Sequence, residues 1–389
     1  MSGRTYPLGT IEGLAEGLWF IHGQMPDHAS KAPDYCNIVI YRRGPRLYMV
    51  DSGGGTAMRD SIRKVLCTVG AVDSFTLINT HTHLDHICNN DLIAEVQADS
   101  KHHYLLRTGI DPAQLDASRY FAEQFGQLEA VYDPLSSYQT ERARYRMAAV
   151  LRDVLGIAVG HTRVMRWLFA IQLRKFAPVG DSRQTMQAID DRPGERIDIG
   201  GVAWNGWRLG DDDVYVLEAR SHSTCDVIVY IPEHRLLCMG DITFPLFPTW
   251  ADSSRDQTLD VLRKSLAMTQ AGNVAALADG HGDRCYRGQP EIAALLGTVL
   301  DDHTDFEAAL AEVCAGTDAL TPAEVYDRFR RLPNRPVVPK YLDLEYPHTP
   351  PSLQNVMVTT MRQLGYRTSG PRRHRRFHRP DGLAAHDQN

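Results

Sequence analysis

The chain has 389 residues, of which 43% are hydrophobic and 23% are charged, and its formal net charge is −6. This balance is typical of a globular protein with a sizeable hydrophobic core, and it excludes an overall positive field that would attract nucleic acid or an anionic membrane. The chain starts without a secretory pattern and has no apolar run of about 18 residues, so we expect neither an export signal nor a membrane span. The 7 cysteines lack CxxC spacing, which favours reduced thiols in a cytoplasmic protein.

Short apolar runs rich in β-forming residues occur in two groups. The first group comprises GLWFIHG, NIVIYRR and RLYMVDSGG, followed by a predicted helix at about 57–69 and the run FTLINTH. The second comprises VAWNGWRL, VYVLEARSH, DVIVYIP and RLLCMGD, followed by a predicted helix at 256–270 and the run VAALADGHG. Because each group has strands, then a helix and one more strand, the pattern predicts two sheets packed face to face with helices outside.

Two further regions are predicted to be helical. Residues 91–180, between the two groups, have apolar positions at helical spacing and no convincing strand. Their apolar stripe, which includes Trp167, fits packing against the sandwich or a second subunit better than a substrate lid, so a homo-oligomer through this insertion is one interpretation. Residues 289–370 are predicted to be helical, with Thr321 as the N-cap of one helix. Residues 371–389 are predicted to be a basic, disordered tail whose arginines fit solvent better than nucleic acid.

The densest group of ionisable side chains lies at 79–90, NTHTHLDHICNN, directly after an apolar run. In an extended segment alternate side chains point the same way, so His81 and His83 can bind one ion. Asp85 and His86 follow where the backbone bends, and they can face a second ion nearby. Imidazole and carboxylate together suit a borderline divalent ion such as zinc.

Further metal-capable residues stand at the ends of other predicted strands, namely His222, Asp241 and His281. Asp51, which precedes three glycines, has the same placement. Each of these residues alone has an ordinary interpretation, as a satisfied polar residue for His222, a helix cap for Asp241, and a turn for His281 and Asp51. Their joint order and placement after strands predict one shared metal site.

With these residues the chain resembles the metallo-β-lactamase superfamily, through HxHxDH at 81–86 and the ordered later positions. The resemblance covers roughly residues 15–288 and implies an αββα sandwich in a catalytic domain at 1–288, with the metal site along one edge. The helical insertion at about 91–180 and the helical C-terminal region lie outside this pattern. The resemblance assigns His81, His83 and His222 to a first metal, Asp85, His86 and His281 to a second, Asp241 to both, and Asp51 to an outer position that fixes the ligands.

Two zinc ions per chain are therefore expected, with iron or manganese as alternatives. A water bridging two divalent cations loses a proton near neutral pH and becomes a nucleophile. Asp85 and Asp241 would orient it and pass a proton to the leaving group. The interpretation is a dinuclear metal-dependent hydrolase of an ester, lactone, amide or similar activated bond of a small-molecule substrate.

Several details bear on the substrate. Asp241 stands where zinc β-lactamases commonly have cysteine, so the chain is similar to the lactonase, glyoxalase II and RNase Z side of the superfamily. Phe244 replaces the tyrosine of acyl-homoserine lactonases, and GHGDRCY differs from the GHxY of glyoxalase II, so no substrate is assigned. Phe244, Phe247 and Trp250 either line a pocket for an apolar or aromatic group or pack as core. His28 or Tyr35, in the loop GQMPDHASKAPDY, could contact substrate.

Two alternative functions use the same ligands. A phosphodiesterase or nuclease of the RNase Z type needs a basic groove for phosphates, against which the net charge of −6 argues. An iron-dependent redox protein of the same fold is the other alternative.

Overall fold

The computed structural model describes residues 6–24, 35–106, 180, 186–243, 253–282, 284–317, 319–343, 352–370 and 376–378. The chain divides into two compact units. The first unit comprises Met1–Phe121, Ala170–Phe244 and Asp256–Gly297. The second comprises Ala122–Phe169, Pro245–Arg255 and Thr298–Asn389.

The first unit contains a seven-stranded sheet in which the strands follow chain order, β1-β2-β3-β4-β5-β6-β7. Its strands are β1 (Ile11–Ala15), β2 (Leu18–Ile21), β3 (Ile38–Arg43), β4 (Arg46–Val50), β5 (Val72–Ile78), β6 (Ala98–Leu105) and β7 (Gln187–Ala188). The pairs from β1 to β4 are antiparallel, and those from β4 to β7 are parallel. Helix α1 (Gly55–Val69) connects β4 to β5, and α2 (Leu84–Ile87) and the 3-10 helix η1 (Asn90–Glu95) precede β6.

A second seven-stranded sheet in this unit has the order β14-β13-β12-β11-β10-β9-β8. Its strands are β8 (Glu195–Ile199), β9 (Val202–Leu209), β10 (Val214–Glu218), β11 (Val227–Ile231), β12 (Leu236–Cys238), β13 (Ala276–Ala278) and β14 (Tyr286–Arg287). Only β12 and β13 pair in parallel, because α6 (Arg255–Gln270) connects them. The short 3-10 helices η4 (Ile189–Asp191), η5 (Pro232–His234) and η6 (Gly240–Thr243) lie between strands.

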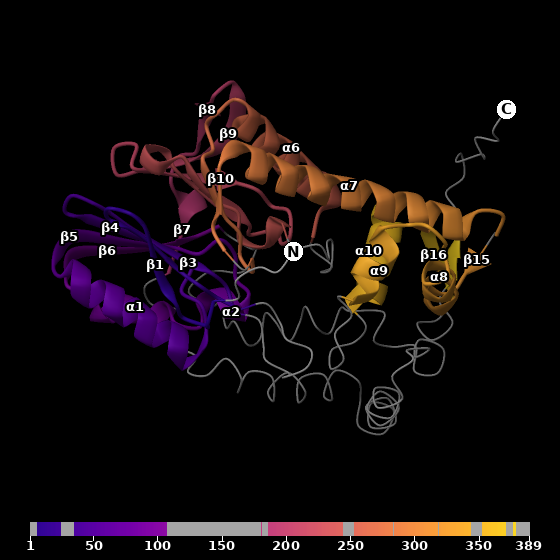
Figure 1. The fold of residues 1–389 in the computed structure, drawn as a ribbon, viewed down its shortest axis with the longest axis horizontal. Coiled ribbons are helices and arrows are strands. Elements are labelled where there is room, and N and C mark those ends of the chain that lie inside the picture. Colours follow the sequence, from indigo (N-terminus) through magenta and orange to yellow (C-terminus); the bar gives the residue numbers. More distant parts are fainter. Residues whose placement is uncertain are drawn as a thin grey trace. The chain divides into compact units, whose positions relative to one another are not determined.

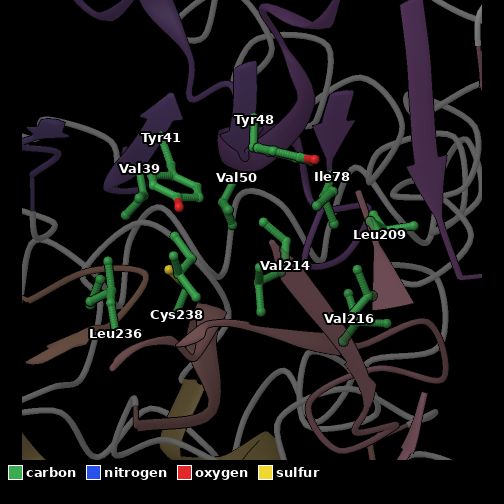
Figure 2. Packing of buried hydrophobic residues seen from close by; sticks show 14 of the residues in the cluster. Val39, Tyr41, Tyr48, Val50, Ile78, Leu209, Val214, Val216, Leu236 and Cys238 are labelled. Atoms are coloured by element: carbon green, nitrogen blue, oxygen red, sulfur yellow. The ribbon is translucent and has the colours of Figure 1, made fainter. Parts of the chain in front are cut away.

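The two sheets pack face to face over a shared apolar core. Alternate residues of a strand point to opposite faces, and on β3 Val39 and Tyr41 enter this core while Ile38 and Ile40 face the other way. Figure 2 shows residues of the first sheet, such as Val39, opposite residues of the second, such as Leu236. The outward-facing set packs against α1, which contributes buried residues including Met58, Ile62 and Val65.

Helices cover the outer faces of the sandwich (Figure 1). Helix α1 lies against the first sheet, and α6 lies against the second, where Trp204 Nε1 donates to Met268 Sδ at 3.2 Å. The layers are therefore helix, sheet, sheet and helix, which confirms the predicted αββα sandwich. None of the 7 cysteines, all of which are described, forms a disulfide.

One sequence prediction about the insertion is wrong. Strand β6 (Ala98–Leu105) falls within 91–180, where no strand is expected. Only its last three residues are buried. The residues before them are mostly polar and exposed, so the strand lacks the apolar run that would have predicted it. Parallel pairing with β5 nevertheless adds it to the sheet. The rest of the insertion, with Trp167, lies outside the described residues.

The second unit contains the C-terminal helices. Helix α7 (Gln289–Cys314) begins in the first unit and ends in the second, followed by α8 (Pro322–Phe329), α9 (Val337–Asp343) and α10 (Ser352–Gln363). As predicted, Thr321 is an N-cap and accepts a hydrogen bond from the backbone N–H of Glu324. The Phe306 ring stacks on Tyr341 with centroids 4.6 Å apart. Among the helices that the structure describes, none is both long and apolar enough to span a membrane.

A small three-stranded sheet accompanies these helices, with the order β15-β17-β16. Its strands are β15 (Ala319–Leu320), β16 (Arg367–Ser369) and β17 (Arg376–His378). Strand β17 lies within the predicted disordered tail, so that prediction is wrong at these residues. Phe377 explains the difference, because it is 2% exposed and anchors the strand.

Candidate metal centre

Seven histidine and aspartate side chains meet where strands of the two sheets end. They come from the segment after β5, from α2, and from the segments after β10, β12 and β13: His81, His83, Asp85, His86, His222, Asp241 and His281. Two backbone hydrogen bonds tie ligand-bearing segments to the opposite sheet, from Val227 N at the start of β11 to Thr80 O at 2.8 Å and from Asn37 N, just before β3, to Gly280 O at 2.7 Å. All seven side chains are buried.

The first group of possible ligands comprises His81, His83, His222 and Asp241, whose ligand atoms all lie within 4.8 Å of one another. Nε2 of His222 lies 2.9 Å from Nδ1 of His83. Nε2 of His81 and Nε2 of His222 are each 3.6 Å from Oδ2 of Asp241. Three imidazoles and one carboxylate oxygen therefore converge on one point.

The second group comprises Asp85, His86, Asp241 and His281, again within 4.8 Å. Nε2 of His281 lies 2.9 Å from Oδ2 of Asp85 and 3.3 Å from Oδ1 of Asp241. Nε2 of His86 lies 3.1 Å from the same Asp241 oxygen. Asp241 thus belongs to both groups, with Oδ2 facing the first and Oδ1 facing the second.

Several atoms in these groups are buried without a hydrogen bond of acceptable geometry to any described residue. They are His81 Nε2, Asp85 Oδ2, His86 Nε2 and Asp241 Oδ1. Leaving such atoms unsatisfied costs on the order of 1–3 kcal/mol each. Imidazole nitrogens and carboxylate oxygens are ligands that divalent ions such as zinc accept. The arrangement therefore fits a divalent metal site.

The charges inside the two groups are coupled. Burial lowers the pKa of His81 and His222 well below the usual histidine value, so both rings are neutral and can offer a lone pair. Burial also opposes charge on His281, but Asp241 and Asp85 raise its pKa well above the usual value. Burial would raise the pKa of Asp241, yet the His281 imidazole holds it well below its usual range. Metal binding at the second group must therefore displace protons from imidazoles.

Asp51 lies behind the second group rather than within it. Its Oδ1 accepts a hydrogen bond from Thr80 N at 2.7 Å, and its Oδ2 accepts one from Thr80 Oγ1 at 2.8 Å. The same Oδ2 lies 2.9 Å from Nδ1 of His86. This contact fixes the ring so that Nε2 of His86 faces Asp241 and Asp85.

Sequence reasoning missed four buried polar residues that support the ligands: Asn37, Thr80, Asp226 and Asp279. Thr80 lies 3.1 Å from Nδ1 of His81 through its Oγ1. Burial raises the pKa of Asp226 to about 7 and that of Asp279 to about 6. The only signal in the sequence is the position of the two aspartates, since Asp226 lies four residues after His222 and Asp279 lies two residues before His281.

The backbone approaches the centre closely at Gly280. A Cβ atom at this position would lie 2.1 Å from Oδ1 of Asp241 and 2.9 Å from the Gly240 carbonyl oxygen. Because no side chain fits at that distance, glycine is required for Asp241 to hold its place between the two groups.

Of the predicted substrate contacts, Tyr35 alone is described. It is 9% exposed and pairs through its backbone with Gln24, with N–O distances of 2.8 and 3.0 Å. It belongs to the core cluster that includes α1 residues such as Met58. His28, Phe244, Phe247 and Trp250 lie outside the described residues.

Comparisons with known proteins agree with this architecture. A family model described as the metallo-beta-lactamase superfamily matches residues 32–281. A metallo-beta-lactamase family protein from Thermus thermophilus is 17% identical with a TM-score of 0.52, covering 94% of this chain and 100% of that one. A beta-lactamase domain protein from Burkholderia ambifaria is 15% identical with a TM-score of 0.55, covering 97% and 96%. No curated protein matches the sequence significantly. Likeness at such low identity shows the fold alone.

Proposed function

Since the chain belongs to the metallo-β-lactamase superfamily, as its motifs predict, we propose that it is a dinuclear metal-dependent hydrolase. Its reaction is attack of an activated water on an ester, lactone, amide or similar activated bond of a small substrate. Two zinc ions per chain would be held, one by His81, His83 and His222, the other by Asp85, His86 and His281, with Asp241 available to both.

The observation that carries the proposal is the position of Asp241. Its two carboxylate oxygens face different groups, Oδ2 at 3.6 Å from His81 and His222, and Oδ1 at 3.1 Å from His86 and 3.3 Å from His281. A single carboxylate that serves two sets of imidazoles is suited to hold two cations side by side. A turn that binds no ion would not require one carboxylate to lie between two sets of imidazoles.

Divalent ions bound there would supply Lewis acidity and lower the pKa of a coordinated water. The chain itself supplies orientation and proton transfer. Asp85 and Asp241 hold the attacking water by accepting its hydrogen bonds, and Asp85 takes the proton that later reaches the leaving group. The buried imidazoles keep the ligand set rigid and exclude other water from the centre.

The preference for an apolar or aromatic substrate rests on the sequence of the loop after Asp241, ITFPLFPTW. These side chains follow the proposed ligand Asp241 closely in sequence, and apolar side chains of this kind would supply apolar area to a ligand.

A screen on protein of measured metal content tests the function. We expect hydrolysis of esters, lactones or amides that depends on metal and is lost in Asp241→Asn. The control is His234→Asn, a half-buried histidine on η5 outside both ligand groups. Turnover of bis-nitrophenyl phosphate in preference to every ester would instead support the phosphodiesterase alternative. Iron in excess of zinc, in protein purified without added metal, would support the redox alternative.

A further inference from the structure

We propose that Asp226 and Asp279 are positioning residues, each holding the turn that presents one histidine ligand. Asp226 thereby sets the metal affinity of the first site, and Asp279 sets that of the second. This inference rests on the proposed metal centre, and it concerns residues to which neither a motif nor the family match assigns a role.

Asp226 organises the turn between β10 and β11 that carries His222. Its Oδ2 accepts hydrogen bonds from Ser221 Oγ and from Ser223 N, both at 2.9 Å. Its Oδ1 accepts one from Ser223 Oγ at 2.7 Å. The two serines flank His222 directly, so one carboxylate ties down the residue before the ligand and the residue after it.

The backbone of Asp226 closes the same turn. Its carbonyl oxygen accepts hydrogen bonds from Ala219 N and Arg220 N, each at 3.0 Å. Asp226 is only 3% exposed. Burying a carboxylate is costly unless hydrogen bonds compensate for the lost water, and the three hydrogen bonds that the Asp226 carboxylate accepts all come from the ligand-bearing turn.

Asp279 has the equivalent place in the turn that carries His281. Its Oδ1 accepts a hydrogen bond from Gly282 N at 2.6 Å, so a carboxylate two residues before His281 binds the residue directly after it. Its Oδ2 accepts a 3.4 Å bond from Thr243 Oγ1, in the 3-10 helix η6 that also carries Asp241. A Cβ atom at Gly282 would lie 2.1 Å from Oδ1, so the turn closes tightly onto this carboxylate.

Asn37 holds the same turn from the first sheet. Its Nδ2 donates to Asp279 O and to Gly282 O, both at 3.0 Å, and its Oδ1 accepts from Gly23 N at 2.7 Å. The His281 turn is therefore fixed from both sheets.

Neither aspartate belongs to a group of possible metal ligands among the described residues. Each therefore acts through the residues next to a ligand in its turn, unlike Asp51, whose carboxylate contacts the His86 ring itself. Ligand orientation set by such outer contacts typically changes metal affinity by about 10- to 100-fold when the contact is lost. The two histidine turns serve different groups, and the link from Asp279 to the shared Asp241 is one long bond of 3.4 Å to Thr243, so the two effects are separable.

The experiment uses the full chain in two single-site backgrounds. His86→Ala disables the second site and leaves His81, His83 and His222, whereas His83→Ala disables the first. Metal-free protein is titrated with Co²⁺, followed by visible absorption and by competition with a chelator. Asp226→Asn and Asp279→Asn are introduced into each background, since asparagine keeps the shape but loses acceptor capacity.

The expected result is selective. Asp226→Asn lowers Co²⁺ affinity by about 10- to 100-fold in the His86→Ala background and changes it less than about twofold in the other. Asp279→Asn gives the reverse pattern. The matched control is Asp198→Asn, because Asp198 is an exposed aspartate that accepts from Gly201 N at 2.9 Å in a turn without ligands. It should change neither affinity.

A merely structural role predicts a different pattern, with a lower melting temperature and equal losses at both sites, and that pattern would overturn the proposal. Unchanged affinities would also overturn it. If Asp226→Asn does not fold, Ser221→Ala removes a single bond to Asp226 and should weaken the first site alone by a few-fold. Wild-type protein that binds fewer than two Co²⁺ ions would refute the dinuclear centre as well, whereas two ions with insensitive variants would refute only the positioning.

Discussion

The Oδ2 atom of Asp51 lies 2.9 Å from Nδ1 of His86, which joins the end of β4 to the short helix α2. A carboxylate at Nδ1 favours a proton on that nitrogen and leaves the Nε2 lone pair for a metal. Asp51 also has a positive φ of 58°. Aspartate and asparagine tolerate this backbone conformation better than most residues do. An aspartate at this position can therefore adopt the backbone of the turn and also bind the His86 ring.

Asp51→Asn therefore tests the carboxylate without straining the backbone. We expect metal affinity at the second group to fall by about 10- to 100-fold, because the His86 ring loses its charged partner. The first group should change less, since Asp51 contacts the His86 ring, which belongs to the second group alone. Stepwise titration of metal-free protein measures both values. Equal weakening of both steps would contradict this assignment.

Asp241 should be the most sensitive position of the centre. Asp241→Ala removes an oxygen from each group, so we expect loss of ions from both and a fall in turnover of several orders of magnitude. His222→Ala should lower occupancy of the first group only. Elemental analysis after gel filtration gives the ion count per chain, with His234→Ala as a histidine control. Near-normal turnover in the Asp241 variant would show that this residue is not shared between two ions.

The fold could be predicted largely from local sequence, because most strands are apolar runs that end in turn residues. NIVIYRR and DVIVYIP became β3 and β11, and the helix predicted at 57–69 is α1. Strands that form mainly because they pair with a neighbouring strand could not be predicted. Strand β6 begins with exposed polar residues and is fixed by pairing with β5, and β17 has three residues held between β15 and β16.

The candidate site divides in the same way. Its seven possible ligands follow predicted strand ends, so their placement predicted that they meet, and the resemblance to the superfamily divided them into two groups. The supporting residues have no such pattern. Asn37 contacts the backbone of Asp279 and Gly282 across more than 240 positions, and only the packed sandwich makes those neighbours visible.

Acid should destabilise the C-terminal helices through His303. Burial lowers the pKa of this histidine to about 4, below the value of about 6.5 for an unfolded chain. The folded state therefore keeps the ring neutral while the unfolded state takes up a proton. The stability from the neutral ring is complete above about pH 6.5 and is lost as the pH falls toward 4, by roughly 3 kcal/mol at most.

His303→Leu should flatten this dependence. His303 Nε2 is buried without a hydrogen bond to any described residue, so an apolar side chain of similar volume fits the position. Thermal melts between pH 4 and 8 measure the difference, with similar melting temperatures expected at pH 8. A variant whose melting temperature falls with acid as steeply as that of the wild type would exclude His303 as the cause.

The apolar loop after Asp241 predicts a substrate preference. If Trp250 lines the pocket, Trp250→Ala should raise KM for an aromatic ester far more than for a small acetate ester, with metal content unchanged. Burial of one ring contributes about 25 cal/mol per Å² of apolar area, which amounts to a few kcal/mol. Equal changes in KM for both esters, together with a large fall in melting temperature, would show that Trp250 is core packing instead.

Gly280 offers a test of the centre that alters no ligand. A Cβ atom there would lie 2.1 Å from Asp241 Oδ1, so Gly280→Ala must push this carboxylate or the turn aside. Overpacking of this kind costs about 1–3 kcal/mol of folding free energy. Because Asp241 serves both groups, we expect both ions to bind more weakly, in contrast to the selective loss in the His222 variant.

The matched control is Gly297→Ala, since a Cβ at Gly297 in helix α7 meets nothing within 4 Å. Alanine in a helix is more favourable than glycine by about 1 kcal/mol, so this control should keep both ions and melt slightly higher. Metal content and melting temperature of the two variants decide the matter, and full occupancy in Gly280→Ala would mean that Asp241 does not depend on this close approach.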